Sequence, residues 1–244
     1  EYTYDPSVFN SYPHLAQPDT PQATHSGITF GEPNRPDESR NVTIHSGGAT
    51  GGDAAWAKLT KLVQQGVAGK TNAWSFKGHN ISEGDPREIA NLMDDSETSR
   101  RLALTGKNLG RPIPTSNYAA KLVHRNWFQV REAHAVIASV VGFDKKNPDK
   151  VDGGTGWAVQ MGIDEKIPVH IFNESTKQWY TWDNSPEKQE WNEVNIEDIP
   201  FYQEFAGVGS RRIGELGEKA IADYGKRLEA FQKTDKPFTP LNDT

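Results

Sequence analysis

Two glycine-rich segments are the most promising chemical feature of this chain. The first reads Ser-Gly-Gly-Ala-Thr-Gly-Gly-Asp over residues 46–53 and follows the β-prone run 42–45. The second reads Asp-Gly-Gly-Thr-Gly-Trp over residues 152–157. Glycine lets backbone amides approach a ligand closely, and a helix that begins after such a loop directs free N–H groups and partial positive charge towards it. We therefore expect the two loops to clamp the phosphate and sugar of one nucleotide-like ligand.

Hydroxyl and carboxylate side chains beside these glycines extend the expected site. Asp53 either caps the following helix or binds a ribose hydroxyl. Neither loop matches the dinucleotide fingerprint or the Lys-Ser/Thr ending of a P-loop, so the alternative is that the glycines only allow tight turns and close packing. The two loops together contribute these expected ligand-binding residues: Ser46, Gly47, Gly48, Thr50, Gly51, Asp53, Gly153, Gly154, Thr155 and Gly156.

A helix expected over residues 115–133 supplies further candidates. Arg125 and Gln129 are four residues apart and share one helical face, and Asn126 is adjacent to Arg125. An arginine that faces the glycine loops offers a fork of donors suited to phosphate, whereas the alternative is a solvated arginine paired with a local carboxylate. A third glycine turn follows the strand signal near residue 205 and adds Ser210 and Arg211 to the expected ligand-binding set.

Alternating strand and helix signals surround these residues. Strands are expected over 42–46, 73–76, 134–140 and 167–172 and at 205–211, helices over 53–65, 115–133, 155–164 and 213–231, and a hairpin partner over 178–182. Residues 77–114 are expected to form one or two short helices and a loop over the active face. This alternation predicts an α/β fold with a Rossmann-like, mostly parallel sheet and helices on both faces. On such sheets ligands bind at the carboxyl ends of the strands.

The expected organisation is an extended amino-terminal arm over residues 1–40, a single α/β domain over 41–233 and a tail over 234–244. The arm is rich in proline and polar residues, and we expect Tyr2 and Phe9, with the neighbouring tyrosines, to anchor it on the body or on a second subunit. A homodimer or higher oligomer is the predicted assembly.

Composition excludes several functional classes. The formal net charge is -6, which argues against broad binding to nucleic acid. The chain has no cysteine, so disulfides, thiolate metal sites and cysteine nucleophiles are excluded. The histidines show no metal-binding spacing, and we expect neither a metal nor a cofactor. The sequence has no apolar stretch long enough to span a membrane, and a cytoplasmic location is expected.

The motifs resemble those of the SLOG superfamily, the Rossmann-like group that includes the Lonely Guy phosphoribohydrolases and the DprA-type proteins. Lonely Guy enzymes carry an Arg-Lys pair, a buried strand and then Pro-Gly-Gly-x-Gly-Thr-x-x-Glu. This chain has Arg125-Asn126, the apolar run 135–138 and Asp-Gly-Gly-Thr-Gly-Trp-Ala-Val-Gln over 152–160. Residues 46–49 resemble the first glycine loop of the superfamily, and Gly-Ser-Arg at 209–211 resembles a strand end of DprA-like domains in a different chain order.

The resemblance implies a nucleotide pocket and places the catalytic pair of the family at Arg125 and Gln160. The family has Glu at the second position, and Gln can neither act as a general base nor stabilise an oxocarbenium ion by charge. Asp53, Asp152 and Glu165 are the carboxylates that could replace it. The expected function is a SLOG-type binding protein that senses, carries or sequesters a nucleotide or another phosphorylated ligand. A Lonely Guy-like phosphoribohydrolase that cleaves nucleoside monophosphates is the alternative, and a DprA-like nucleic-acid accessory protein is the second alternative.

Overall fold

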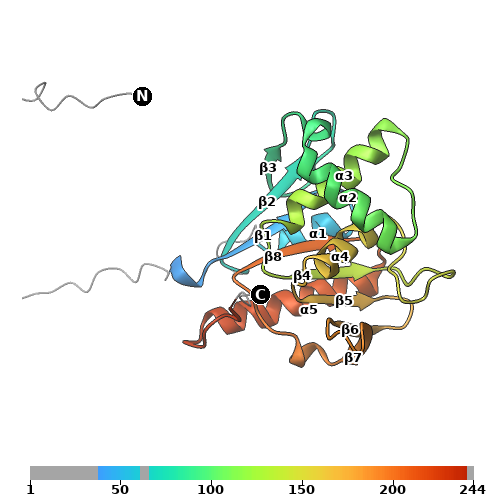
Figure 1. The fold of residues 1–244 in the computed structure, drawn as a ribbon. Coiled ribbons are helices and arrows are strands. Elements are labelled where there is room, and N and C mark those ends of the chain that lie inside the picture. The colour runs from blue at the N-terminus through green and yellow to red at the C-terminus, as the bar shows by residue number, and fades with distance from the viewer. Residues whose placement is uncertain (1–37, 61–65, 241–244) are drawn as a thin grey trace, which may run out of the picture. The chain divides into compact units, whose positions relative to one another are not determined.

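An eight-stranded sheet forms the centre of the part of the chain that the structure describes. The computed structural model describes residues 38–60 and 66–240, which belong to one compact unit spanning Asp37–Thr244. The strand order is β3-β2-β1-β8-β4-β5-β6-β7 (Figure 1). The six parallel strands are β3 (Asp85–Glu88), β2 (Gly69–Ser75), β1 (Val42–Ser46), β8 (Glu204–Gly209), β4 (Val136–Val140) and β5 (Val169–Asn173). At one edge β6 (Gln178–Asp183) and β7 (Glu190–Val194) continue the sheet antiparallel.

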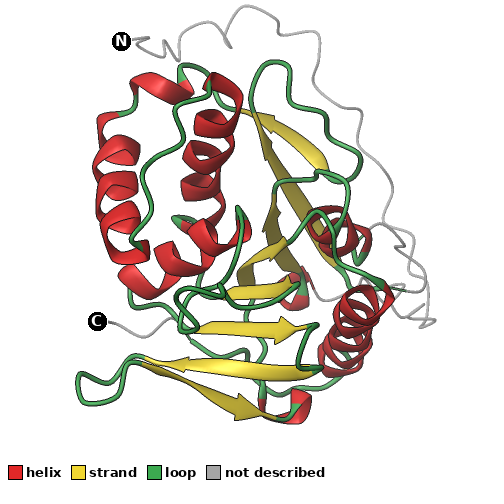
Figure 2. Ribbon diagram, turned by 90° about the vertical axis from the view of Figure 1, so that its right-hand side faces the viewer, coloured by secondary structure: helices red, strands yellow, loops and turns green. Residues whose placement is uncertain are grey.

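Helices cover both faces of this sheet (Figure 2). One face carries α1 (Gly52–Lys58) and α5 (Glu215–Gln232), and the other carries α2 (Ser96–Leu109), α3 (Asn117–Val130) and α4 (Thr155–Asp164). Among the described residues there are three short 3-10 helices: η3 (Glu38–Arg40) precedes β1, whereas η4 (Leu92–Asp94) and η5 (Ile196–Asp198) lie in connections. The predicted Rossmann-like α/β fold is therefore confirmed.

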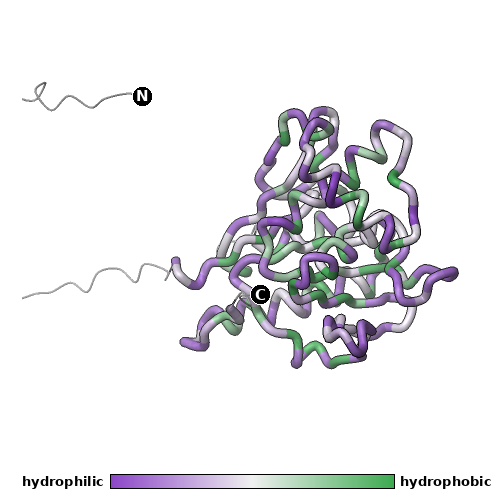
Figure 3. Tube along the Cα trace, viewed as in Figure 1, coloured by the Kyte–Doolittle hydropathy of each residue, from purple (hydrophilic) through white to green (hydrophobic). Residues whose placement is uncertain are grey.

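Each face of the sheet has its own hydrophobic core. On the α1 and α5 side, Trp56 packs edge-on against Phe205 and Tyr224, and all three are fully buried. On the other side, Trp127 and Trp157 from α3 and α4 pack with the apolar residues of β4 and β5. Hydrophobic segments run through the centre of the body, and hydrophilic segments are common in the outer loops (Figure 3). A sheet buried on both faces explains why the β4 sequence Val-Ile-Ala-Ser-Val is almost continuously apolar.

Several elements differ from the sequence-based expectation. α1 is shorter than the helix predicted over 53–65, of which 61–65 lie outside the described residues. The region 77–114 contains the edge strand β3 and the 14-residue helix α2 rather than only short helices. Asp95 explains the start of α2, because its side chain accepts a hydrogen bond from Glu97 N, and Gly110 ends the helix with φ of 65°. The expected arm over 1–40 lies almost entirely outside the described residues.

The connections after β1, β8 and β4 meet at the end of the sheet where the carboxyl ends of the parallel strands lie. β8 pairs with β1 on one side and with β4 on the other, and all three strands run parallel. Their carboxyl ends are followed by the first glycine loop, by residues 210–214 and by the segment that leads to the second glycine loop. From here the strand order proceeds to β2 and β3 in one direction and to β5 in the other. Such a topological switch point is where ligands bind in doubly wound sheets.

Candidate functional site

A cavity of about 610 Å³ opens at this switch point. Its walls come from the first glycine loop, α3, the second glycine loop with the start of α4, and the segment after β8. Ten of the predicted ligand-binding residues line it: Thr50, Asp53, Arg125, Asn126, Gln129, Gly153, Gly154, Thr155, Ser210 and Arg211. The fold thus brings together residues from four separate segments of the chain.

Helix α3 contributes a continuous stripe to the cavity wall. Tyr118, Leu122, Arg125, Asn126 and Gln129 all line the cavity, and their spacing follows one face of a helix. The stripe is apolar towards the start of α3 and polar towards its end. Tyr118 is 45% exposed, whereas Arg125 is 5% and Gln129 is 1% exposed. The polar part of the stripe is therefore buried. Leaving the amide of Gln129 or the guanidinium of Arg125 without a hydrogen-bond partner there costs free energy.

Asp53 and Arg125 form a buried ion pair at the cavity wall. Arg125 Nη1 donates to Asp53 Oδ2 over 3.2 Å, and Gly209 N donates to Asp53 Oδ1 over 3.0 Å. Burial raises the pKa of Asp53 above its ordinary value, and the charge of Arg125 acts in the opposite direction. Asp53 does not cap α1, whose N-cap residue is Gly51. The carboxylate instead fixes Arg125 and joins the first glycine loop to the end of β8.

The first glycine loop is packed tightly by the protein itself. A Cβ on Gly47 would lie 1.8 Å from Arg125 Nη1 and 2.1 Å from Asp53 Oδ2, so the buried ion pair requires glycine there. Ser46 is fully buried, and its hydroxyl donates to the backbone oxygen of Asp53. Gly48 O accepts hydrogen bonds from the amide and hydroxyl of Ser82. Of residues 46–53, Ala49, Thr50 and Asp53 line the cavity, whereas Ser46, Gly47, Gly48 and Gly51 do not.

The second glycine loop is more open towards the cavity. A Cβ added to Gly153 or to Gly154 would meet no atom within 4 Å. Gly154 is the N-cap residue of α4, and no side chain caps this helix. Gly154 and Thr155 line the cavity, so α4 begins at the cavity wall and no side chain accepts a hydrogen bond from its first amides. Gly156 does not line the cavity. A Cβ there would lie 2.2 Å from Val151 O, so this glycine allows close packing of the backbone.

Two side chains hold the second loop in place. Arg111, from the residues just after α2, donates to Asp144 Oδ2 over 2.7 Å, to Val151 O over 3.0 Å and to Gly153 O over 3.2 Å. From the cavity side, Asn126 Nδ2 donates to Gly154 O over 3.2 Å. Both side chains donate to backbone carbonyl groups, so they fix the loop backbone at the start of α4.

Residues after β8 complete the cavity with positive charge. Ser210 Oγ lies 3.4 Å from Thr155 Oγ1, which links this segment to the start of α4. Arg211 and Arg212 are exposed and line the cavity. Together with Arg125 they give the cavity three arginines against the carboxylates of Asp53 and Asp152. This local excess of positive charge contrasts with the net charge of -6 for the whole chain.

Gln160, the position implied by the family resemblance, lies away from this cavity. Its Nε2 donates to Asp164 Oδ1 over 2.9 Å, one turn further along α4, and the side chain is 4% exposed. It lines a separate cavity of about 310 Å³ beside Trp182. Glu165 is ion-paired with Arg101 and is not part of the main cavity either. Asp53 and Asp152 are thus the carboxylates that line the main cavity.

Sequence reasoning missed part of the cavity wall. Tyr118 and Leu122 precede Arg125 by about two and one helical turns, so the same helical spacing could have identified them. Arg212 follows directly after the predicted Arg211. Val141 carried no sequence signal, because its place beside the cavity depends on where β4 ends.

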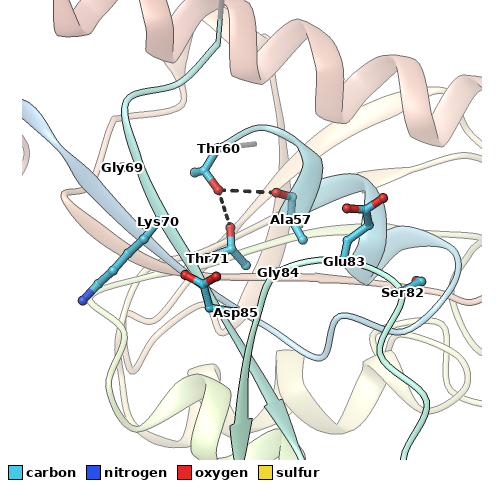
Figure 4. A pocket seen from close by; sticks show the side chains of 9 residues that line it. All are labelled: Ala57, Thr60, Gly69, Lys70, Thr71, Ser82, Glu83, Gly84 and Asp85. Atoms are coloured by element: carbon cyan, nitrogen blue, oxygen red, sulfur yellow. Dashed lines mark hydrogen bonds between the residues drawn. The ribbon is translucent and has the colours of Figure 1, made fainter. Parts of the chain in front are cut away.

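A smaller cavity of about 330 Å³ lies between α1 and the β2–β3 edge of the sheet (Figure 4). Thr60 and Thr71 occupy one wall, and their hydroxyls are 2.8 Å apart. Thr60 also donates to Ala57 O, so these buried polar groups satisfy each other. Among the described residues that line this cavity, none has a buried side-chain donor without a partner. Within residues 38–60 and 66–240, no cluster of three or more metal-ligating side chains occurs, and no helix there is long and apolar enough to cross a membrane.

The fold and the cavity together define a Rossmann-like α/β protein with its candidate site at the topological switch point. A scan of protein-family models found no match to the chain. Searches of curated proteins and of solved structures likewise found no match.

Proposed function

We propose that this protein binds a nucleotide or a closely related phosphorylated small molecule in the switch-point cavity, in the manner of a SLOG-type sensor, carrier or sequestering protein. The observation that carries the proposal is that the uncapped start of α4 lines the same cavity as Arg125, Arg211 and Arg212. Helix N-termini and arginine forks both favour phosphate oxygens. Gln129 lines the same cavity, and its buried Nε2 has no hydrogen-bond partner among the described residues.

The cavity wall has a polar part near the start of α4 and an apolar part along the start of α3, which supports a ligand that combines a phosphate with an apolar group. The phosphate is placed at Gly153–Thr155, beside Ser210 and the two exposed arginines. The apolar part of the ligand, such as a base, is placed along Tyr118 and Leu122. Tyr118 packs edge-on against Phe76, with the ring centroids 5.6 Å apart, and this contact orients the ring at the cavity wall. A nucleoside monophosphate has both parts in one molecule.

Calorimetric titration of the wild type with adenosine monophosphate and with adenosine tests the proposal. The phosphate is expected to make at least two charge-assisted hydrogen bonds, so the nucleotide should bind at least tenfold more tightly than the nucleoside. The affinity of the nucleotide should also decrease as salt is added, since the site is cationic. Equal affinities for the two compounds, or no binding of any phosphorylated compound in a wider panel, would contradict the proposal.

A phosphoribohydrolase is the second candidate, and the observation that favours it is the presence of Asp53 and Asp152 in the cavity wall. Cleavage of an N-glycosidic bond passes through an oxocarbenium-like state that a carboxylate stabilises. Both oxygens of Asp53 already accept hydrogen bonds, which fits a fixed charge better than a proton carrier. Incubation with nucleoside monophosphates should release no free base. Robust base release by the wild type, lost in Asp152→Asn and retained in Gln160→Ala, would establish the hydrolase instead.

A further inference from the structure

The second glycine loop begins with the one Asp-Gly dipeptide of the chain, Asp152-Gly153, and the sequence contains no Asn-Gly dipeptide. Both residues are exposed, and a Cβ on Gly153 would meet no atom within 4 Å. A side chain on the residue after an aspartate hinders access to the peptide bond between them, and glycine has no side chain. The peptide bond between these two residues is therefore open to chemistry that a bulkier neighbour would block.

The side chain of Asp152 is turned back onto the amide that follows it. Gly153 N donates a hydrogen bond to Asp152 Oδ1 over 2.7 Å. The side-chain carbon Cγ is bonded directly to Oδ1, so the distance from Gly153 N to Cγ differs from this value by at most one bond length. Neighbouring groups react readily when the reacting atoms are held about 3–3.5 Å apart. The loop thus holds the carboxyl carbon and the amide nitrogen close to the geometry of an intramolecular condensation.

Contacts on both sides of this peptide bond hold the loop in that geometry. Asp152 N donates to Gly142 O over 3.1 Å. Arg111 donates to Val151 O over 3.0 Å and to Gly153 O over 3.2 Å. Gly153 has φ of 68°, a conformation that glycine adopts without strain. The carboxyl group and the following amide are therefore kept together in the folded protein.

We propose that Asp152 is a site of spontaneous isoaspartate formation and that this modification distorts the second glycine loop. Gly153 N attacks Cγ of the Asp152 carboxylic acid. A bond forms between this nitrogen and Cγ, the bond from Cγ to its hydroxyl breaks, and the hydroxyl leaves with the amide proton as water. The product is a five-membered succinimide ring that contains both carbonyl carbons of the former aspartate.

Water then opens the succinimide at one of these two carbonyl carbons. Addition at Cγ breaks the new bond and restores aspartate. Addition at the main-chain carbonyl carbon of Asp152 breaks its bond to Gly153 N, so the chain continues through Cβ and Cγ as isoaspartate. Water is released in the first step and consumed in the second, and no other reactant takes part.

Isoaspartate lengthens the main chain by one carbon atom between residues 152 and 153. The added atom displaces Gly153 and Gly154 from Val151, whose carbonyl is held by Arg111. Gly154 is the N-cap residue of α4 and lines the switch-point cavity. The isoaspartate form should bind adenosine monophosphate about tenfold more weakly, the loss expected for one hydrogen bond to a phosphate. This consequence for binding rests on the proposed function, whereas the modification itself does not.

The test incubates the folded wild type for weeks at neutral pH and body temperature and maps tryptic peptides at intervals. Trypsin releases residues 151–166, a peptide that also contains Asp164 followed by Glu165. Asp164 is the internal control, because its carboxylate accepts hydrogen bonds from Thr105 and Gln160 instead of from the next amide. Isoaspartate, detected by enzymatic methylation and located by fragmentation, should be at least about tenfold more abundant at 152 than at 164. A succinimide, lighter by one water, should appear as the intermediate.

Asp152→Glu is the matched variant, since it keeps the carboxylate but would need a larger ring. It should form no isomer at position 152, and its affinity for adenosine monophosphate should stay at its own starting value throughout the incubation. The isoaspartate form of the wild type, separated by ion exchange, should unfold at a lower denaturant concentration than fresh protein and bind the nucleotide more weakly.

The inference is overturned if isoaspartate at 152 does not exceed that at 164, because the loop geometry then has no effect on the reaction. It is also overturned if the isoaspartate form unfolds at the same denaturant concentration as fresh protein, because the loop is then not distorted. A fresh wild type that binds no phosphorylated compound overturns the proposed function alone, since the peptide map and the unfolding measurement require no ligand.

Discussion

Gly154→Val is expected to weaken ligand binding without lowering the stability of the fold. Gly154 has φ of -66° and ψ of -32°, which an L-amino acid adopts without strain. A Cβ at this position would meet no atom within 4 Å, because it projects into open space at the start of α4. The neighbouring Gly153 has φ of 68°, so a side chain there would strain the backbone. Position 154 can therefore be filled without disturbing the fold.

The expected magnitudes are opposite for stability and for binding. A glycine replaced in a compatible conformation changes the free energy of unfolding little or raises it by about 0.4–1 kcal/mol, because the unfolded chain loses freedom. The valine methyl groups would occupy the space in front of the α4 amides. Loss of one charge-assisted hydrogen bond to phosphate costs about 1.5–3 kcal/mol, which corresponds to a decrease in affinity of roughly 10- to 100-fold.

The assay is a calorimetric titration with adenosine monophosphate, combined with denaturant unfolding of the same samples. Gly154→Val should unfold at the same or slightly higher denaturant concentration and bind the nucleotide at least tenfold more weakly. Gly154→Ala, which adds only one methyl group, should give a smaller loss. A folded Gly154→Val variant with wild-type affinity would refute the placement of the phosphate at this helix.

Three further predictions concern the second loop, the response to pH and the assembly. Arg111→Lys keeps the charge but loses the forked guanidinium that reaches Asp144 and two backbone carbonyls. The affinity for the nucleotide should fall about tenfold while the affinity for adenosine stays the same. An equal loss for both compounds would contradict a role of Arg111 in orienting the second glycine loop for phosphate. Burial lowers the pKa of His170 from 6.5 to about 4. The contribution of this residue to the free energy of unfolding is therefore fully present above pH 6.5, and about 3 kcal/mol is lost as the pH falls towards 4. His170→Gln should reduce the difference in unfolding free energy between pH 7 and pH 4 by about that amount, and an unchanged difference would show that other groups control the acid response. Light scattering should give a mass near twice the 27.1 kDa chain mass, whereas a mass near 27.1 kDa would refute the predicted homo-oligomer.

The sequence allowed the fold to be predicted because its strongest signals are local. Thr155–Asp164 is helical over the expected residues, and the apolar run that includes 136–140 is a buried strand. Edge strands were harder to identify: β3 has the sequence Asp-Pro-Arg-Glu and is exposed throughout. Its pairing depends on β2 lying beside it, which no local pattern encodes.

Ten of the fifteen expected ligand-binding residues line the switch-point cavity, but the contacts that individual residues make could not be predicted from the sequence. The first glycine loop was expected to contact the ligand through its glycines, but Gly47 is required by the buried Asp53–Arg125 pair instead. Such a pair joins residues 72 positions apart and cannot be read from spacing. Similarly, the placement of Gln160 depends on the rotation of α4 about its axis, because its neighbours Thr155 and Ala158 face the main cavity.

The most direct test of the central claim is a crystal structure with adenosine 5′-monothiophosphate, whose sulfur can be located by its anomalous signal. The chain has no cysteine and only two methionines, so a ligand sulfur would stand out against very few others. The account predicts a sulfur peak within hydrogen-bonding distance of the backbone amides at Gly154 and Thr155, with the base along Tyr118. A peak at another location in the molecule, with the switch-point cavity empty of ligand, would contradict it.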